Sequence, residues 1–165
     1  MSMASAAPAS GAPAGFLLRL VASIIDSVIL AIIIFVISFV LGMVLGMNGI
    51  VLATIISYVI GGILAIFYWG KMESGKDQAT LGKKVMKIKV ASTAGGALDF
   101  AGAIKRSWVH WLGYFLAVID LVIGTGYILA GIVGIVTLIS CVAVAFKSNK
   151  QGFHDDWANA QVVRV

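Results

Sequence analysis

Residues 15–45, GFLLRLVASIIDSVILAIIIFVISFVLGMVL, form a long apolar run that carries two charged side chains, Arg19 and Asp26. About 20 apolar residues at roughly 1.5 Å each cross a hydrocarbon core of about 30 Å, so the run predicts a membrane-spanning helix. A charge inside such a helix costs roughly 2.5–3.5 kcal/mol on insertion scales and therefore needs a partner or a function. Arg19 and Asp26 share one helix face but lie about 10 Å apart, so we expect each to find a partner elsewhere.

The position of this helix relative to the lipid has two solutions. If the helix enters the hydrocarbon near Phe16, Arg19 lies at the inner interface and Asp26 lies near the middle of the membrane. If the lipid-spanning part is 27–47, which is long enough by itself, Asp26 lies just below the hydrocarbon in a cytoplasmic vestibule. The sequence fits both registers.

The composition indicates an integral membrane protein. The chain has 165 residues, which fits one domain, and it is 61% hydrophobic and 12% charged with a mean hydropathy of +1.05. The net charge of +5 does not indicate a nucleic-acid partner, because the basic residues cluster in 71–106 and after residue 146, as the positive-inside rule expects of cytoplasmic segments. The single cysteine, Cys141, excludes an intrachain disulfide framework.

Glycine-rich turns divide the apolar sequence into four predicted spans, which are residues 16–45, 50–69, 107–123 and 127–146. Four spans place both termini on the cytoplasmic side. A three-span alternative would leave the C-terminal tail outside, but Lys147, Lys150 and Arg164 argue against it. The fold class that we predict is an all-α membrane protein, a four-helix transmembrane bundle.

The water-facing parts are predicted as follows. Residues 1–14 are rich in Ala, Ser, Gly and Pro and are expected to be disordered. VMKIKVA (85–91) alternates apolar and basic residues, and with the STAGG turn (92–96) and a returning strand at 97–100 it predicts a small cytoplasmic β-hairpin between helices 2 and 3. We expect four of its basic residues to face lipid phosphates or water; these are Lys83, Lys84, Lys87 and Lys89. A solvated basic loop that is attracted to anionic lipid is the alternative. The last residues, AQVVRV, predict a further short strand.

Three motifs resemble the RDD family of small membrane proteins, which is named for one arginine and two aspartates. RLVASIID carries Arg19 and Asp26, and ATLGKK followed by a strand, a Gly-containing turn and Arg106 is similar to the cytoplasmic loop of that family. QGFHDDW is similar to its closing segment and places the second aspartate at Asp155. The resemblance covers residues 15–165. It implies a multi-pass protein of the cell membrane, and for some members an exchange of sodium or other monovalent cations for protons.

Two functions follow as expectations. The first is a small transporter that works as a homo-oligomer, with monovalent cation and proton as substrates and with ion or proton binding at Asp26, Arg19, Asp155, Arg106 and Asp120. The second is a non-transporting membrane adaptor that binds a partner or anionic lipid, in which the same charges form a structural ion network. No spacing indicates an enzyme, a metal site or a cofactor.

The tail adds one geometric expectation. GFHDDW follows the last span closely, and Phe153 and Trp157 lie one helical turn apart. If both rings face the membrane interface, Asp155 or Asp156 is directed towards the basic residues at the helix entrances. Arg19 and Arg106 are the expected partners.

Overall fold

The structure is a computed structural model that describes residues 11–165. Four long helices make up most of it: α1 (Phe16–Leu45), α2 (Ile50–Ser74), α5 (Trp108–Ile123) and α6 (Ile128–Phe146). The short elements are the 3₁₀ turn η1 (Met47–Gly49), the helices α3 (Leu81–Val85), α4 (Phe100–Arg106) and α7 (Phe153–Trp157), and the strands β1 (Ile88–Ser92) and β2 (Ala160–Arg164).

Three helical segments are long and apolar enough to cross a membrane, namely α1, Met47–Ser74 and α6. Helices α4 and α5 pass the same test only as a pair, and they are bent by 65° at Ser107. The described residues therefore contain three candidate spans, or four if this bent pair counts as one. Helical structure before the predicted span at 107–123 begins already at Phe100, the first residue of α4. Asp99 caps α4, because its side chain accepts a hydrogen bond from the Gly102 N–H at 2.8 Å.

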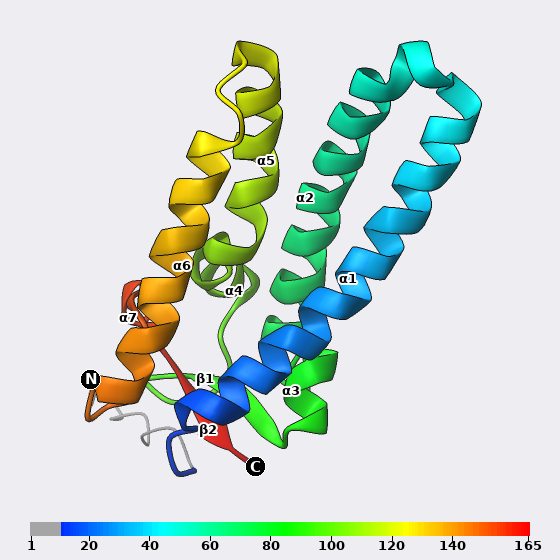
Figure 1. Cartoon of the computed structure of the whole chain (residues 1–165). Helices are drawn as coiled ribbons and strands as arrows, with labels where there is room; N and C mark the ends of the chain where they lie inside the picture. Colours follow the sequence, from blue (N-terminus) through cyan, green and yellow to red (C-terminus); the bar gives the residue numbers. More distant parts are fainter. Residues whose placement is uncertain (1–10) are drawn as a thin grey trace, which may run out of the picture.

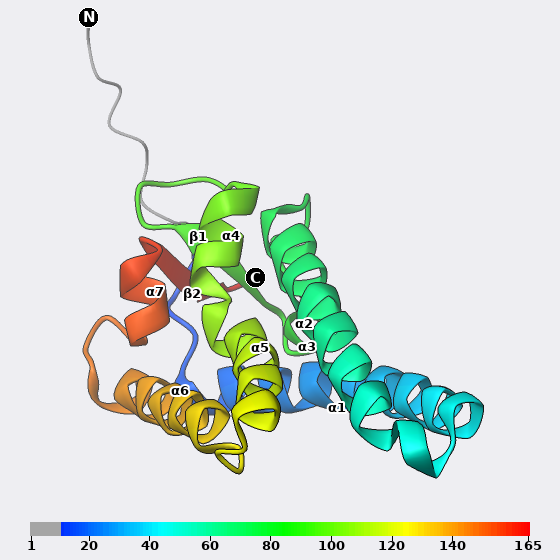
Figure 2. The same ribbon diagram turned by 90° about the horizontal axis from the view of Figure 1, so that it is seen from above.

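The four long helices form a ring (Figures 1 and 2). Helix α2 packs against α1 and α5, α5 packs against α6, and α6 touches α1. The outer surface of this ring is apolar: the side chains of Phe35 and Phe146, for example, are 69% and 85% exposed. Exposed apolar faces of this extent suit contact with lipid.

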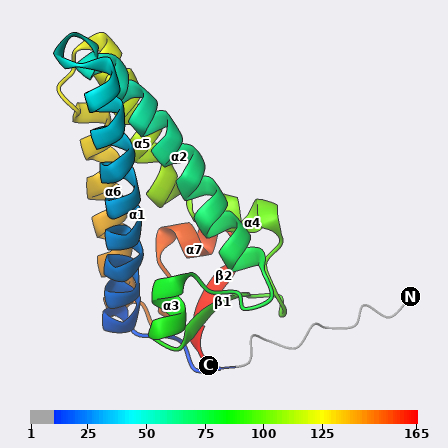
Figure 3. The same cartoon turned by 90° about the vertical axis from the view of Figure 1, so that its right-hand side faces the viewer.

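The short elements gather at one end of the ring, which we call the sheet end (Figures 1 and 3). It holds β1, β2, α3, α4 and α7, whereas η1 and the turn at 124–127 lie at the opposite end. Gly124 and Gly126 have φ of 76° and 66°, a left-handed backbone that favours glycine, and the predicted turn at 124–126 is present.

The predicted β-hairpin is wrong. Strand β1 pairs with the C-terminal strand β2, antiparallel, from Ile88 opposite Arg164 to Ser92 opposite Ala160. The turn at 92–96 is present, since the Ser92 N–H donates to the Gly96 carbonyl at 3.0 Å, but residues 97–99 form no strand. Val85, predicted as strand, ends helix α3. The predicted strand at the C-terminus is confirmed as β2.

The prediction of disorder is wrong for residues 11–14. The Ala14 N–H donates to the Val162 carbonyl at 2.8 Å, Pro13 forms a β-bridge to Val163, and Ala14 is fully buried. Residues 1–10 lie outside the described part of the chain. Together these contacts bury a small apolar core beneath the sheet, formed by Ala14, Ala22, Ile88, Val90, Leu98, Ala158, Ala160 and Val162.

Candidate functional site

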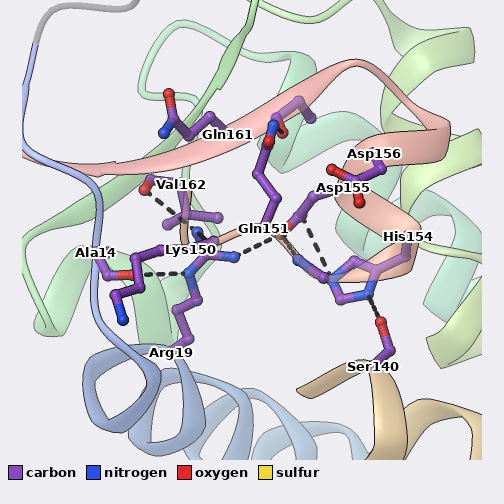
Figure 4. A network of polar contacts seen from close by, with 12 residues as sticks. Ala14, Arg19, Ser140, Lys150, Gln151, His154, Asp155, Asp156, Gln161 and Val162 are labelled. Carbon is purple, nitrogen blue, oxygen red and sulfur yellow. Dashed lines mark hydrogen bonds and ion pairs between the residues drawn. The ribbon is translucent and has the colours of Figure 1, made fainter. Parts of the chain in front are cut away.

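Arg19 fastens the preceding N-terminal segment and the distant C-terminal tail to the first turn of α1 (Figure 4). Its Nη1 lies 2.5 Å from Oδ2 of Asp155, its Nε donates to the Ala14 carbonyl at 3.1 Å, and its Nη2 donates to the Lys150 carbonyl at 2.5 Å. The guanidinium therefore joins the N-terminal segment and the tail, and the tail contact expected from the sequence is present.

Asp155 lies in α7 and is fully buried between two arginines. Its Oδ1 accepts from Nε of Arg106 at 2.8 Å, and its Oδ2 also accepts from the Gly152 N–H at 3.0 Å. Burial would raise the pKa of Asp155, but the positive charge of Arg106, with that of Arg19, holds this pKa well below its usual range. Asp155 is therefore an anion with all its charge compensated inside the protein.

The chain of charges continues from Arg106 to the end of α2. Nη1 of Arg106 lies 2.6 Å from Oε2 of Glu73, and Oε1 of Glu73 pairs with Nζ of Lys83. All three side chains are at most 6% exposed. We call Arg19, Asp155, Arg106, Glu73 and Lys83 the ion network. The prediction that Lys83 faces lipid is wrong, because the α3 turn directs it inward to Glu73.

His154 supports the tail from the side opposite Arg19 (Figure 4). Its Nδ1 lies 2.8 Å from the Ser140 hydroxyl and its Nε2 lies 3.4 Å from Oδ1 of Asp155. Burial lowers the pKa of His154 to about 4, although the charge of Asp155 acts in the opposite direction. A Cβ on Gly152 would lie 2.9 Å from the Ser140 carbonyl oxygen, so only glycine lets the tail approach α6 this closely.

Asp26 is not part of the ion network. It is 1% exposed, and its carboxylate accepts hydrogen bonds from the Thr80 and Tyr68 hydroxyls at 2.5 and 2.6 Å and from the Gly82 N–H at 2.7 Å. Among the described residues no cationic group lies within ion-pair distance of it. The spacing in TLG (80–82) places the Thr80 hydroxyl and the Gly82 N–H where both donate to the Asp26 carboxylate.

Asp120 is separate from both clusters. It is buried at the opposite end of the bundle, where it accepts hydrogen bonds from the Thr125 hydroxyl and from the N–H groups of Leu129 and Ala130 at 3.1 and 2.9 Å. It therefore closes the turn between α5 and α6 and satisfies donors at the start of α6. This geometry gives Asp120 a local structural role and brings it close to no other predicted site residue.

The other three lysines of the basic loop lie on the surface of the sheet end. Lys84 and Lys87 are exposed and Lys89 is half-buried, and together with Lys76 they line a shallow hollow. Lys84 also pairs with Asp77 at 2.6 Å in an exposed contact. These positions leave Lys84, Lys87 and Lys89 accessible to an anionic surface.

Sequence reasoning missed Glu73 and Tyr68. Glu73 is the only acid in α2 and lies two residues after Lys71, which ends the uncharged run 27–70; an acid so close to a long uncharged run is a usable signal for a buried partner of a basic residue. Its position at the end of a predicted span suggests a solvated group instead. Tyr68 fits the headgroup belt by position, and only the fold directs its hydroxyl to Asp26.

Comparison with known proteins agrees with the motifs. The model of the RDD family matches residues 13–159. The "Uncharacterized protein YxaI" of Bacillus subtilis (strain 168) is 30% identical over 112 residues, which are 68% of this chain and 60% of that protein. The chain thus matches less than two thirds of the length of this relative. No solved structure matches significantly. With the family model covering nearly all of the described residues, the chain belongs to the RDD family.

Proposed function

We propose that the protein is a small multi-pass transporter of the cell membrane that exchanges a monovalent cation for a proton at Asp26. The observation that carries this proposal is the contrast among the buried carboxylates. Glu73 and Asp155 each contact two cationic side chains, whereas Asp26 is held by neutral O–H and N–H donors alone. Asp120 also has neutral donors alone, but they are the N–H groups and the hydroxyl of the turn that it closes at the opposite end. Among the buried carboxylates of the sheet end, Asp26 is the one without a fixed positive partner, and such a carboxylate can accept a proton or a cation.

The surroundings of Asp26 fit a small hard cation. Thr80 and Tyr68 place hydroxyl oxygens beside the carboxylate, and these oxygens become ligands if their O–H bonds turn away. Thr80 and Gly82 belong to the segment between α2 and β1, so Asp26 faces the sheet end. This supports the register in which residues 27–47 cross the lipid and Asp26 lies in an inner vestibule.

The proposed orientation has four spans, with α4 and α5 acting as one bent span and the sheet end in the cytoplasm. The density of Lys and Arg at the sheet end supports this orientation. Cysteines introduced at Asn48 and Ser148 in a Cys141→Ala background are expected to label from opposite sides of the membrane. Labelling from the same side contradicts this topology. A four-helix ring barely surrounds a path, so the proposal includes a homo-oligomer.

Proteoliposomes that contain a pH dye test the exchange. A pulse of Na⁺ or K⁺ is expected to move protons in the native protein, and Asp26→Asn is expected to abolish this movement. Asp99→Asn is the matched control, because Asp99 is exposed and asparagine also caps helices. Tyr68→Phe retains the carboxylate and is expected to raise the cation concentration that gives half-maximal exchange. Normal exchange in a folded Asp26→Asn protein excludes the proposal.

The second candidate is a non-transporting, non-enzymatic membrane adaptor. The lysine-lined hollow formed by Lys76, Lys84, Lys87 and Lys89 favours it, since exposed lysines attract anionic headgroups by roughly 1 kcal/mol each near the surface. Binding to vesicles with and without phosphatidylglycerol, compared between the native protein and Lys87→Glu, tests this role. No cation-dependent proton movement together with Lys87-dependent vesicle binding favours the adaptor over the transporter.

A further inference from the structure

A cavity of about 60 Å³ lies at the sheet end between α1, α5, α6 and the tail. Arg19, Lys83 and Arg106 line it, but Glu73, Asp155 and Asp26 do not. The carboxylates of the ion network thus lie behind the cations, and the cavity itself is bordered by positive charge. Within the ion network three cations face two anions, which leaves one positive charge without a contacting anion. The charge of Asp26 reaches Lys83, but Asp26 contacts none of the three cations and does not line the cavity.

Several hydrogen-bond donors at this cavity lack an acceptor among residues 11–165. Nη2 of Arg106 has no hydrogen bond, and Nζ of Lys83 donates only to Glu73. The hydroxyl of Ser23 and the ring of His110 make no side-chain hydrogen bond within the described residues, and both line the cavity. The His110 ring is held in place by stacking on Trp69, with 4.2 Å between centroids and 6° between planes. Arg106 and Lys83 are buried, Ser23 and His110 are half-buried, and the one buried side-chain donor that lacks a partner among residues 11–165, Nε1 of Trp108, lies outside this cavity. The free donors at the cavity can therefore donate only to a molecule that the cavity holds.

We infer that this cavity binds a small inorganic anion of the size of chloride or nitrate. Such an ion would accept from Arg106, Lys83, His110 and Ser23 and would neutralise the excess charge of the ion network. One water molecule needs roughly 10–15 Å³ of such space, so the cavity has room for a small anion with a few waters. A glycerophosphate headgroup is several times larger and does not fit. The inference is independent of transport at Asp26, which does not line the cavity.

Thermal unfolding in a neutral detergent tests the inference. The native protein is measured in sodium chloride, sodium nitrate and sodium gluconate at equal ionic strength, because gluconate is too large for the cavity. Chloride and nitrate are expected to raise the unfolding midpoint in a saturable way, since a ligand that binds only the folded state stabilises it by mass action. Equal midpoints in all three salts overturn the inference.

Two serines on α1 locate the site. Ser23→Leu fills the cavity and is expected to remove the chloride effect, whereas Ser27→Leu, at an exposed position one turn further on, is expected to retain it. A chloride effect that persists in Ser23→Leu assigns the anion to another place and overturns the inference. Phosphatidylglycerol added without halide tests the other source of anionic oxygen. Stabilisation by this lipid alone, with no effect of chloride or nitrate, also overturns it.

A second measurement needs only the native protein, in case Ser23→Leu does not fold. Cys141 lines the cavity and is the only cysteine in the chain, so its alkylation by iodoacetamide reports on the cavity without background. Bound chloride is expected to slow this reaction by the factor 1 + [Cl⁻]/Kd, which is about elevenfold at ten times Kd. An alkylation rate that is the same in chloride and gluconate contradicts the inference.

Discussion

Replacement of Glu73 by glutamine is expected to destabilise the protein severely. Glu73 is fully buried, and its two oxygens contact Lys83 and Arg106. Glutamine has the same shape as glutamate, but an NH₂ group replaces one of the two carboxylate oxygens and would face Lys83 or Arg106. The substitution therefore removes the negative charge and leaves two buried cations with one carboxylate fewer.

The magnitude follows from the burial. Removal of one partner from a buried ion pair costs about 3–5 kcal/mol, because the other charge stays buried without compensation. Side-chain exposures of 0% at Glu73, 6% at Lys83 and 4% at Arg106 place this network in that class. We expect a fall of that size in the free energy of unfolding, measured by denaturant titration of the purified protein in detergent micelles.

Asp77→Asn is the matched control. Asp77 pairs with Lys84, the neighbour of Lys83, at 2.6 Å, but these side chains are 63% and 41% exposed. Water and salt screen an exposed pair, so this substitution is expected to leave the unfolding curve unchanged within experimental error. If Glu73→Gln and Asp77→Asn unfold at the same denaturant concentration, the ion network does not hold the sheet end together and the reasoning is refuted.

Three further predictions follow from the same contacts. Gly82→Ala would place a Cβ 2.1 Å from the Ala22 carbonyl oxygen, so we expect a loss of about 2–3 kcal/mol in unfolding free energy, whereas Gly113→Ala, with no atom within 4 Å of the new Cβ, should cost nothing measurable. Burial lowers the pKa of His154 from its usual 6.5 to about 4, so the unfolded chain takes up a proton before the folded protein as the pH falls. The contribution of His154 to the free energy of unfolding is therefore full above pH 6.5 and should fall by about 3 kcal/mol towards pH 4. His154→Gln should reduce this dependence of the unfolding free energy on pH. Asp120→Ala should speed proteolysis at 124–127 without altering proton exchange, since Asp120 closes only that turn.

Although the predicted span at 107–123 is a candidate only together with α4, the long apolar helices α1, α2 and α6 and the turn at 124–126 were predictable, because hydropathy and glycine are local signals. The partner of β1 was not. Alternation in 85–91 indicates a strand with one buried face, and a nearby returning strand satisfies that pattern as well as a distant one. The buried residues Ile88 and Val90 in fact pair with Arg164 and Val162 of the tail, more than seventy residues away. Only the tertiary fold, which brings β2 beside β1, selects between a nearby and a distant partner strand.

The arginines and aspartates of the site were also predictable, but the separation of their roles was not. Lys83 and Lys84 are adjacent and identical in type, yet the side chain of Lys83 is 6% exposed and that of Lys84 is 41% exposed. Successive residues of helix α3 point in different directions, so Lys83 lies inside and Lys84 on the surface. Likewise, a sequence motif that contains Arg19 and Asp26 suggests one cluster. The structure gives Arg19 an ionic partner and gives Asp26 neutral ones, a distinction that depends on which segment packs above each side chain.

The two charged residues of α1 are connected through the rest of the sheet end. Arg19 holds α7, which leads directly into β2; β2 pairs with β1; and β1 follows α3, whose start is held by Asp26. The contacts therefore form a closed loop that begins and ends on one helix. The exchange that we propose at Asp26 would change what holds Thr80 and Gly82 in place. Any resulting movement of α3 would act directly on Lys83, which belongs to that helix and pairs with Glu73. A change at Asp26 would thereby reach Arg106 and Asp155 through contacts that are already in place, which gives a physical route for coupling between an ion site and the tail.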